Sequence, residues 1–339
     1  MSFGQSLWER AMIATLLLTV AASGLGLGTT LPPAPPPAAV SDAALPGASA
    51  PTTDIPISPT ADSVVLDSEQ DRYLRMTVPV TIEGFGPFRF MVDTGAQATV
   101  VTPELRDRLQ LRSLGVATVI GMASIRQVEL VQLDGLEFAE RVFDALRTPL
   151  LENRHIGADG IIGLDSLQDL RVLLDFRDDT IAVDDANALG GNSGYEIVVR
   201  ARNKLGRMII TNAVVDGVRT ALIVDTGAQW SIGNAALQSR LRTRGQTDVT
   251  ANDVNGASIA GKLSLAHNVV IDRMQLHSMP IAFADAPAFA ALGYGDKPAL
   301  ILGMESLRLF DRVAIDFAQR KVLFDMPTGS MRDNRMRPG

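Results

Sequence analysis

One stretch of this 339-residue chain occurs twice. The octapeptide FMVDTGAQ at 90–97 returns as LIVDTGAQ at 222–229. Each copy follows an alternating, strand-like segment that ends in a turn, at 80–84 and at 213–217. A strand, a hairpin and a loop that recur together predict that the chain folds as two related units.

Two further matches follow in the same order. IIGLDSL at 161–167 returns as ILGMESL at 301–307, and LDF at 174–176 returns as IDF at 315–317. The separation of corresponding residues grows only from 132 to 141 along the chain. Loops of slightly different length between equivalent elements would produce such a drift. The repeat therefore extends over the whole body of the chain.

Strands dominate both copies, and short helices are expected directly after the repeated glycines, at 165–170 and 305–310. An apolar segment and a proline-rich segment precede the two copies, a glycine-rich segment separates them, and a basic segment follows them. We therefore divide the chain into an apolar N-terminal segment, a Pro/Ala-rich linker, a first lobe, a glycine-rich joint, a second lobe and a basic tail, at residues 1–28, 29–63, 64–188, 189–194, 195–327 and 328–339.

The N-terminal segment has the composition of an export or anchoring sequence. No charged residue occurs from 11 to 41, and 11–22 reads AMIATLLLTVAA. Two interpretations stay open: a signal peptide cut near 20–22, or an uncleaved membrane anchor. Either one predicts that the rest of the chain lies outside the cytoplasm, in the periplasm, tethered to the membrane or secreted.

Composition excludes several kinds of chemistry. The chain has no cysteine and only three histidines, which are widely spaced, so thiolate chemistry and a zinc cluster are not expected. Its formal net charge of −7 opposes binding to phosphate backbones, which argues against a nucleic-acid partner. We expect no cofactor and no metal site.

The two Asp-Thr-Gly loops predict a different chemistry. Each follows a buried strand, and the glycine lets the backbone present N–H groups to the acid. The threonine hydroxyl is able to bond main-chain groups of the opposing loop. If the lobes pack about a pseudo-twofold axis through these loops, Asp93 and Asp225 meet face to face. Two carboxyls so close would hold one proton between them, and so combine an acid and a base.

These residues resemble the aspartic protease superfamily, and most of all its retropepsin-like domains. Asp-Thr-Gly-Ala followed by a Thr-Val type pair, at 99–100 and 231–232, carries the resemblance, together with the apolar-apolar-Gly motifs at 161–163 and 301–303. The chain looks like two such units fused in an exported protein of bacterial type, over roughly residues 70–326. The resemblance implies a bilobal, pseudo-twofold acid-protease fold made of two retropepsin-like β-barrel lobes.

The same resemblance implies an aspartic endopeptidase that cleaves a polypeptide in a cleft between the lobes. Asp93 and Asp225 would activate a water molecule. The residues that would orient them come from the same two loops: Thr94, Gly95, Thr226 and Gly227. The substrate-binding residues are not predicted. The active unit is expected to be a monomer, tethered to the membrane if the N-terminal segment is retained.

The chain departs from the family pattern in three ways. Leu164 and Met304 stand where retroviral proteases have an arginine, which puts that family's salt links between lobes in doubt. No tyrosine lies near the expected flaps, at 117–127 and 252–263, so an aromatic flap of the pepsin type is not expected. Alanine follows each glycine where pepsin-like loops carry a hydroxyl that lowers the carboxylate pKa, which predicts activity extending toward neutral pH.

Two alternatives stay open. The same fold could serve as a noncatalytic periplasmic module that binds peptides. Two chains could also dimerise and pair Asp93 of one subunit with the same residue of the other. The repeated acids Asp165, Glu305, Asp175 and Asp316 are expected to bond backbone or cap helices rather than to catalyse.

Overall fold

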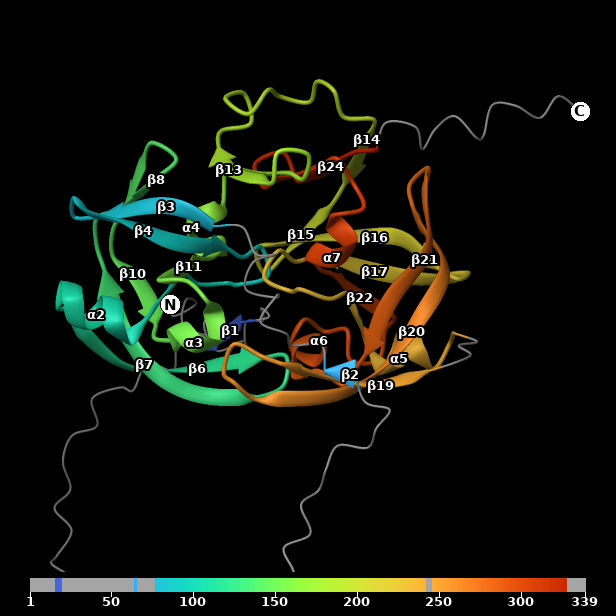
Figure 1. The fold of residues 1–339 in the computed structure, drawn as a ribbon, viewed down its shortest axis with the longest axis horizontal. Coiled ribbons are helices and arrows are strands. Elements are labelled where there is room, and N and C mark those ends of the chain that lie inside the picture. The colour runs from blue at the N-terminus through green and yellow to red at the C-terminus, as the bar shows by residue number, and fades with distance from the viewer. Residues whose placement is uncertain (1–15, 20–63, 66–76, 242–245, 328–339) are drawn as a thin grey trace, which may run out of the picture.

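The structure is a computed structural model that describes residues 16–19, 64–65, 77–241 and 246–327 (Figure 1). The predicted linker at 29–63 and tail at 328–339 lie outside the described residues. Of the predicted leader at 1–28, the described part is β1, Leu16–Thr19. Within the described part of the chain, no helix is both long enough and apolar enough to span a bilayer.

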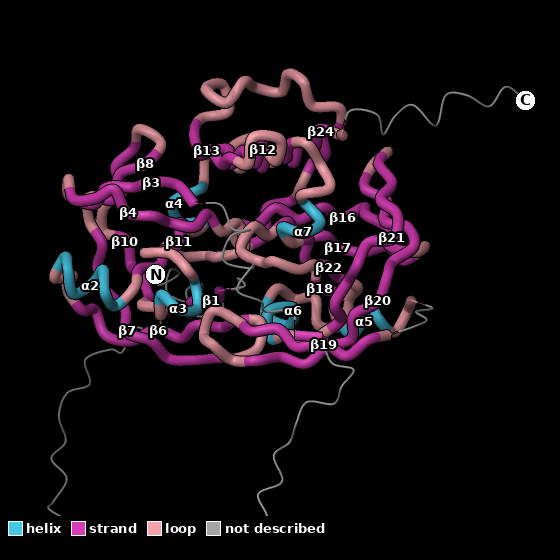
Figure 2. The backbone as a smooth tube through the Cα atoms, in the orientation of Figure 1, coloured by secondary structure: helices cyan, strands magenta, loops and turns pink. Residues whose placement is uncertain are grey.

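The first lobe is built mainly from short strands, drawn in magenta in Figure 2, and most of them pair antiparallel. Its elements in chain order are β3 Thr77–Ile82, β4 Phe85–Val92, β5 Val100–Val101, α2 Pro103–Leu109, β6 Ser113–Gly121, β7 Ile125–Leu133, β8 Leu136–Phe138, β9 Arg141–Phe143, β10 Leu146–Pro149, α3 Asn153–Ile156, β11 Gly160–Ile162, α4 Leu164–Leu167, β12 Arg171–Asp175 and β13 Thr180–Asp184.

The second lobe repeats this plan with longer hairpin strands. Its elements are β14 Ile197–Arg200, β15 Arg202–Lys204, β16 Arg207–Val215, β17 Val218–Val224, β18 Ile232–Gly233, α5 Ala235–Gln238, β19 Thr247–Asn252, β20 Ser258–Ile271, β21 Met274–Phe283, α6 Pro287–Ala291, β22 Ala299–Leu302, α7 Met304–Leu307, β23 Arg312–Asp316 and β24 Lys321–Asp325. The domain boundaries stay a prediction from the sequence.

The same local topology carries the predicted loop in each lobe. β4 runs parallel to β11, with Met91 opposite Ile161, and β17 runs parallel to β22, with Ile223 opposite Ile301. A short antiparallel strand covers the other side of β11 and of β22. The repeated octapeptides therefore occupy equivalent places, and the predicted all-β, bilobal fold is confirmed.

The hairpin turns before these strands are set by their residues. The turn that joins β3 to β4 consists of Glu83 and Gly84, with φ of 48° and 77°. The turn between β16 and β17 consists of Asp216 and Gly217, with φ of 45° and 84°. Two successive residues with positive φ make the tight hairpin turn that matches strand twist, and glycine adopts this conformation without strain.

The expected short helices occur beside the repeated glycines, as α4 and α7. Each begins one residue earlier than predicted and closes after a single turn. A better-capped helix in the first lobe is α2, where the Thr102 hydroxyl accepts a hydrogen bond from Leu105 N and a proline opens the helix.

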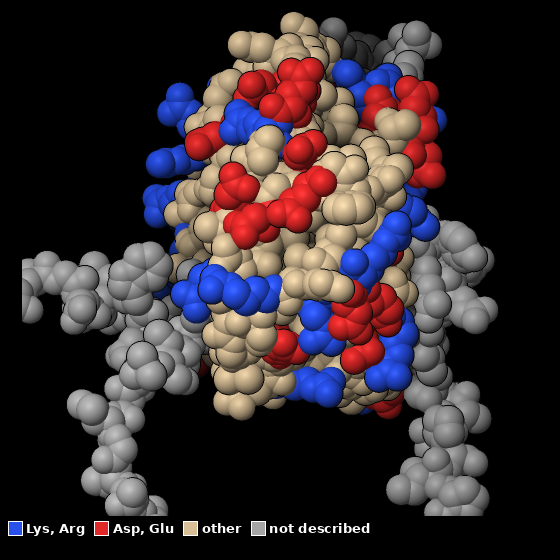
Figure 3. All heavy atoms as spheres, turned by 90° about the vertical axis from the view of Figure 1, so that its left-hand side faces the viewer, with Lys and Arg blue, Asp and Glu red and all other residues tan. Residues whose placement is uncertain are grey.

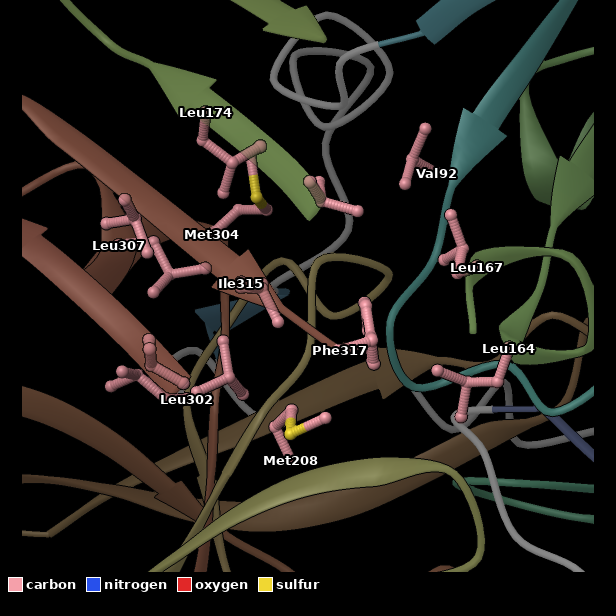
Figure 4. Close-up of a cluster of buried hydrophobic side chains, with 14 of the residues drawn as sticks. Val92, Leu164, Leu167, Leu174, Met208, Leu302, Met304, Leu307, Ile315 and Phe317 are labelled. Carbon is pink, nitrogen blue, oxygen red and sulfur yellow. The ribbon is translucent and has the colours of Figure 1, made fainter. Parts of the chain in front are cut away.

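A shared sheet joins the two lobes, in the strand order β13–β12–β23–β24–β14. Its central pairing is antiparallel, with Arg171 of the first lobe opposite Asp316 of the second. These two buried side chains form an ion pair of 2.6 Å, and the arginine also donates to Asn192 Oδ1 at 2.8 Å. Side chains from both lobes then form one continuous apolar core, which includes Val92 and Leu167 of the first lobe and Phe317 of the second (Figure 4).

The hairpin of β6 and β7 carries one more strand at its free edge. Leu16–Thr19, the described part of the leader, pairs antiparallel with residues 118–121 of β6. On the outer face of the first lobe, acidic and basic side chains are interspersed (Figure 3).

Candidate active site

Asp93 and Asp225 stand at the ends of two buried strands. Asp93 directly follows β4 and its N–H donates to Ile162 O, while Asp225 follows β17 and donates to Leu302 O, both at 3.1 Å. Both side chains are fully buried, with exposed fractions of 0% and 1%. The strand behind each acid therefore holds its backbone rigidly in the interior.

The two carboxyls face each other across the lobe boundary. A Cβ atom added to Gly95 would overlap the carboxyl of Asp225, and a Cβ added to Gly227 would overlap the carboxyl of Asp93. Each acid therefore lies directly against the glycine of the opposing loop. The structure thus brings Asp93 and Asp225 together within one chain. A dimer that pairs Asp93 of one subunit with Asp93 of another is not needed to form the pair.

Main-chain N–H groups hold one oxygen of each carboxyl. Asp93 Oδ1 accepts hydrogen bonds from Gly95 N at 2.7 Å and from Ala96 N at 2.8 Å. In the second loop, the corresponding oxygen of Asp225 accepts from the equivalent glycine and alanine N–H groups, at 2.9 and 3.2 Å. Ionised oxygens are favoured at these positions, since two N–H donors point at each.

The pKa of Asp93 is raised from 3.8 to about 8. Burial is the largest cause, and the neighbouring charge of Asp225 is the second. The two N–H bonds at Oδ1 act in the opposite direction, while the hydrogen bond between the carboxyls raises the value further. Apart from the Asp225 carboxyl, no described residue offers a hydrogen-bond donor to the buried Oδ2 of Asp93. Burial and the charge of Asp225 thus favour the protonated form of the Asp93 carboxyl near neutral pH.

The threonines interlock the two loops. Thr94 Oγ1 donates to Val224 O at 3.1 Å and accepts from Thr226 N at 3.1 Å. Thr226 Oγ1 donates to Val92 O at 2.6 Å and accepts from Thr94 N at 3.0 Å. All four bonds are buried and cross between the lobes, so displacement of one loop would break bonds in the other.

A second layer of hydrogen bonds supports the loop of the first lobe. Asp165 accepts from Thr99 N at 2.9 Å and from Thr99 Oγ1 at 2.7 Å, and Gly163 N donates to the same hydroxyl at 3.2 Å. In the second lobe, Ser231 Oγ takes the equivalent place and accepts from Gly303 N at 3.1 Å. Asp165 thus bonds backbone, as the sequence predicted.

Arg207 is the buried charged residue near the dyad that the sequence analysis did not single out. It begins β16 of the second lobe, and its Nε and Nη2 donate to Gly95 O at 3.1 and 2.7 Å. The missed signal is a further repeat: Arg207-Met208 lies 132 residues after Arg75-Met76, the same separation as the two acids. Arg207 and Arg171 therefore add arginine links between the lobes, whereas Leu164 and Met304, which stand where retroviral proteases have an arginine, are buried in the core.

Two hairpins lie at the expected flap positions. The tip between β6 and β7 contacts the tip between β19 and β20, where Asp253 Oδ2 accepts from Ala123 N at 3.1 Å and from Ser124 Oγ at 2.8 Å. Met122 belongs to a buried cluster of the second lobe, and Val254 belongs to one of the first. The described hairpins are therefore closed against each other, with each tip packed into the opposite lobe.

Trp230 follows the second acidic loop and packs partly buried against Val249 and Ala282. The side chains that would bind a substrate are not identified by these contacts. Among the described residues, no group of three or more His, Cys, Asp or Glu side chains is arranged to hold a metal ion.

The comparisons with known proteins agree with this geometry. Residues 78–169 match the family model described as "gag-polyprotein putative aspartyl protease", and residues 211–306 match the model described as "Aspartyl protease". Together the two matches cover more than half of the chain. No curated protein matches it.

Among solved structures, the chain is similar to a retropepsin-like aspartic protease from Rickettsia conorii. The identity is 22% and the TM-score 0.26, over 38% of this chain and 89% of that one, which is too slight a likeness to support a conclusion. The tandem family matches and the duplicated loops carry the assignment. The chain therefore belongs to the aspartic protease superfamily as a two-lobe, retropepsin-like member.

Proposed function

We propose that the chain is an aspartic endopeptidase in which Asp93 and Asp225 activate water. The observation that carries the proposal is the buried contact of the two carboxyls, each lying against the glycine of the opposing loop. Burial and the second charge raise the pKa of Asp93 to about 8, so this carboxyl retains a proton at neutral pH, which supports a proton shared within the pair. An acid and a base are then present in one site.

The reaction needs no group beyond this pair. The ionised carboxylate takes a proton from a water molecule, whose oxygen attacks the peptide carbonyl carbon, while the protonated carboxyl donates to the carbonyl oxygen. A tetrahedral diol forms. Its collapse restores the carbonyl and breaks the C–N bond as a proton passes to the leaving nitrogen, which leaves a carboxylic acid and an amine.

A polypeptide is the substrate class that the fold favours. The edge of β6 already accepts an extended strand, Leu16–Thr19 of the same chain, through antiparallel pairing. Main-chain pairing of this kind binds extended peptides with little regard to sequence and leaves side-chain choice to neighbouring pockets. With a net charge of −7, the chain is not proposed to bind nucleic acid.

We also propose export, because residues 11–41 lack charge and 11–22 are apolar. N-terminal sequencing of the protein recovered from its native cell tests this. A new terminus near 22 in a periplasmic or secreted fraction fits a cleaved signal peptide, and an intact terminus in the membrane fraction fits an anchor. An intact terminus in the cytoplasmic fraction contradicts export.

Asparagine substitution of each acid tests the catalytic proposal. D93N and D225N keep the size of the side chain but remove the proton chemistry, so each should lower the rate of peptide cleavage by about 100-fold or more while peptide binding persists. D175N, which alters an acid of the sheet that joins the lobes, serves as the control and should cleave at the wild-type rate. Unchanged cleavage in either dyad variant would remove that acid from the mechanism. A wild-type chain that binds peptides and cleaves none would be the noncatalytic module instead.

A further inference from the structure

Arg207 is a fully buried cation with an unusual set of partners. Its exposed fraction is 1%. Nε and Nη2 both donate to Gly95 O in the first lobe, and Nη1 donates to Leu205 O at 3.3 Å. Among the described residues, no carboxylate lies within salt-bridge distance of it. This differs from Arg171, which is equally buried but is paired with Asp316.

A buried guanidinium is costly unless negative charge compensates it. Burial lowers the pKa of Arg207 to about 10, and the charges of Asp225 and Asp93 act in the opposite direction. The side chain therefore remains protonated at neutral pH. The negative charge that offsets it belongs to the dyad, at longer range than an ion pair.

A single peptide group connects Arg207 to Asp93. The Gly95 carbonyl, which accepts two N–H bonds from the guanidinium, belongs to the same peptide as Ala96 N–H. That N–H donates to Asp93 Oδ1 at 2.8 Å. A hydrogen bond at the carbonyl end of a peptide polarises it and strengthens donation at its N–H end. Through this peptide, the positive charge of Arg207 stabilises the ionised form of the dyad.

We propose that Arg207 is the positioning and charge-balancing residue of the dyad: it fixes the first loop from the opposite lobe and favours the singly ionised pair over the doubly protonated pair. The catalytic consequence rests on the function proposed above, whereas the effect on proton binding does not. Lysine would keep the charge, but one ammonium nitrogen on a flexible stem would replace the two guanidinium nitrogens that bond Gly95 O.

Other charged groups near the two loops have their own partners. Asp165 bonds Thr99 behind the first loop, and Glu305 lies 3.5 Å from Gln229 behind the second. Asp253 belongs to the contact of the hairpin tips.

The test compares R207M, R207Q and R207K with R171M as the control for loss of a buried arginine. In a plot of kcat/KM against pH, the two apparent pKa values that bound the active range are the pH limits. Removal of the charge should raise both limits by about one unit in R207M and R207Q. R207K should keep limits within about 0.3 unit of wild type but lose kcat, because the loop is held less firmly. R171M should leave the pH limits unchanged, whatever it does to the melting temperature.

Carbon-13 NMR of the Asp93 carboxyl, titrated from pH 4 to pH 10, supplies a readout that does not need turnover. The midpoint pH of this titration should be higher in R207M than in the wild type. If R207M does not fold, the same increase should be seen in R207Q. An unchanged midpoint and unchanged pH limits in the folded neutral variant would overturn the role of Arg207. If the wild type cleaves no peptide, the proposed function fails, while the NMR midpoint still decides whether Arg207 controls the dyad proton.

Discussion

Replacement of Thr226 by valine should weaken the junction of the two lobes. The side chain keeps its shape but loses the hydroxyl, which donates to Val92 O at 2.6 Å and accepts from Thr94 N at 3.0 Å. Both partners belong to the other lobe and are buried. They would be left without a hydrogen bond in a place that water does not reach.

The size of the effect follows from those two orphaned groups. A buried backbone donor or acceptor that loses its partner costs about 1–3 kcal/mol. T226V should therefore lower the free energy of unfolding by about 2–6 kcal/mol, a large fraction of the stability of an ordinary domain. T226S keeps the hydroxyl and loses one methyl group, which should cost about 1 kcal/mol.

Guanidinium denaturation of the purified chain, followed by circular dichroism, measures both values. Peptide cleavage measured in the same preparations should fall more in T226V than in T226S. The reason is that Asp225 is the neighbour of Thr226 in the chain, so displacement of the loop also displaces its carboxyl. A loss below about 0.5 kcal/mol in T226V, or equal losses in the valine and serine variants, would refute the claim that this hydroxyl couples the lobes.

Three further predictions concern the dyad and the hairpins. The pKa of Asp93 is about 8 in the folded chain against an ordinary 3.8. Between these pH values the folded chain holds a proton that the unfolded chain has released. The stability of the wild type therefore falls as the pH rises from about 4 to about 8. D93N should therefore melt above the wild type at pH 8 and close to it at pH 4, and a difference independent of pH would contradict the shift. G227A places a methyl group against Asp93 Oδ2 and should abolish cleavage, whereas G295A meets only ordinary contacts and should retain it; comparable activities would contradict the packing. S124A removes a hydroxyl that donates to Asp253 and should speed hydrogen exchange at both hairpin tips, and unchanged exchange would mean that this contact does not hold them closed.

The dyad loops could be predicted from the sequence because their signal is local and occurs twice. An acid, a hydroxyl and a glycine after a buried strand specify one backbone conformation, and the repeat specifies two copies of it. The turns at Glu83-Gly84 and Asp216-Gly217 were predictable for the same reason. The place of the short helices also followed, since a glycine precedes each one.

Contacts between the lobes outside the two acidic loops could not be derived in this way. Met122 and Val254 are apolar residues in hairpin tips, and nothing in their neighbours along the chain indicates that each packs into the opposite lobe. Arg207 was missed although its repeat of Arg75 was visible, because a lone arginine at a strand start is ordinarily solvated. Its bond to Gly95 depends on how two units dock, which the sequence pattern of one unit does not contain.

Titration with a peptide that carries a hydroxyl-bearing tetrahedral carbon in place of the scissile carbonyl tests the central claim most directly. The account predicts that one equivalent per chain abolishes peptide cleavage, at nanomolar as well as micromolar protein, because each chain holds one complete dyad. A requirement for half an equivalent per chain would place the dyad between two chains. Cleavage that continues unchanged in excess of the compound would contradict a tetrahedral intermediate at Asp93 and Asp225.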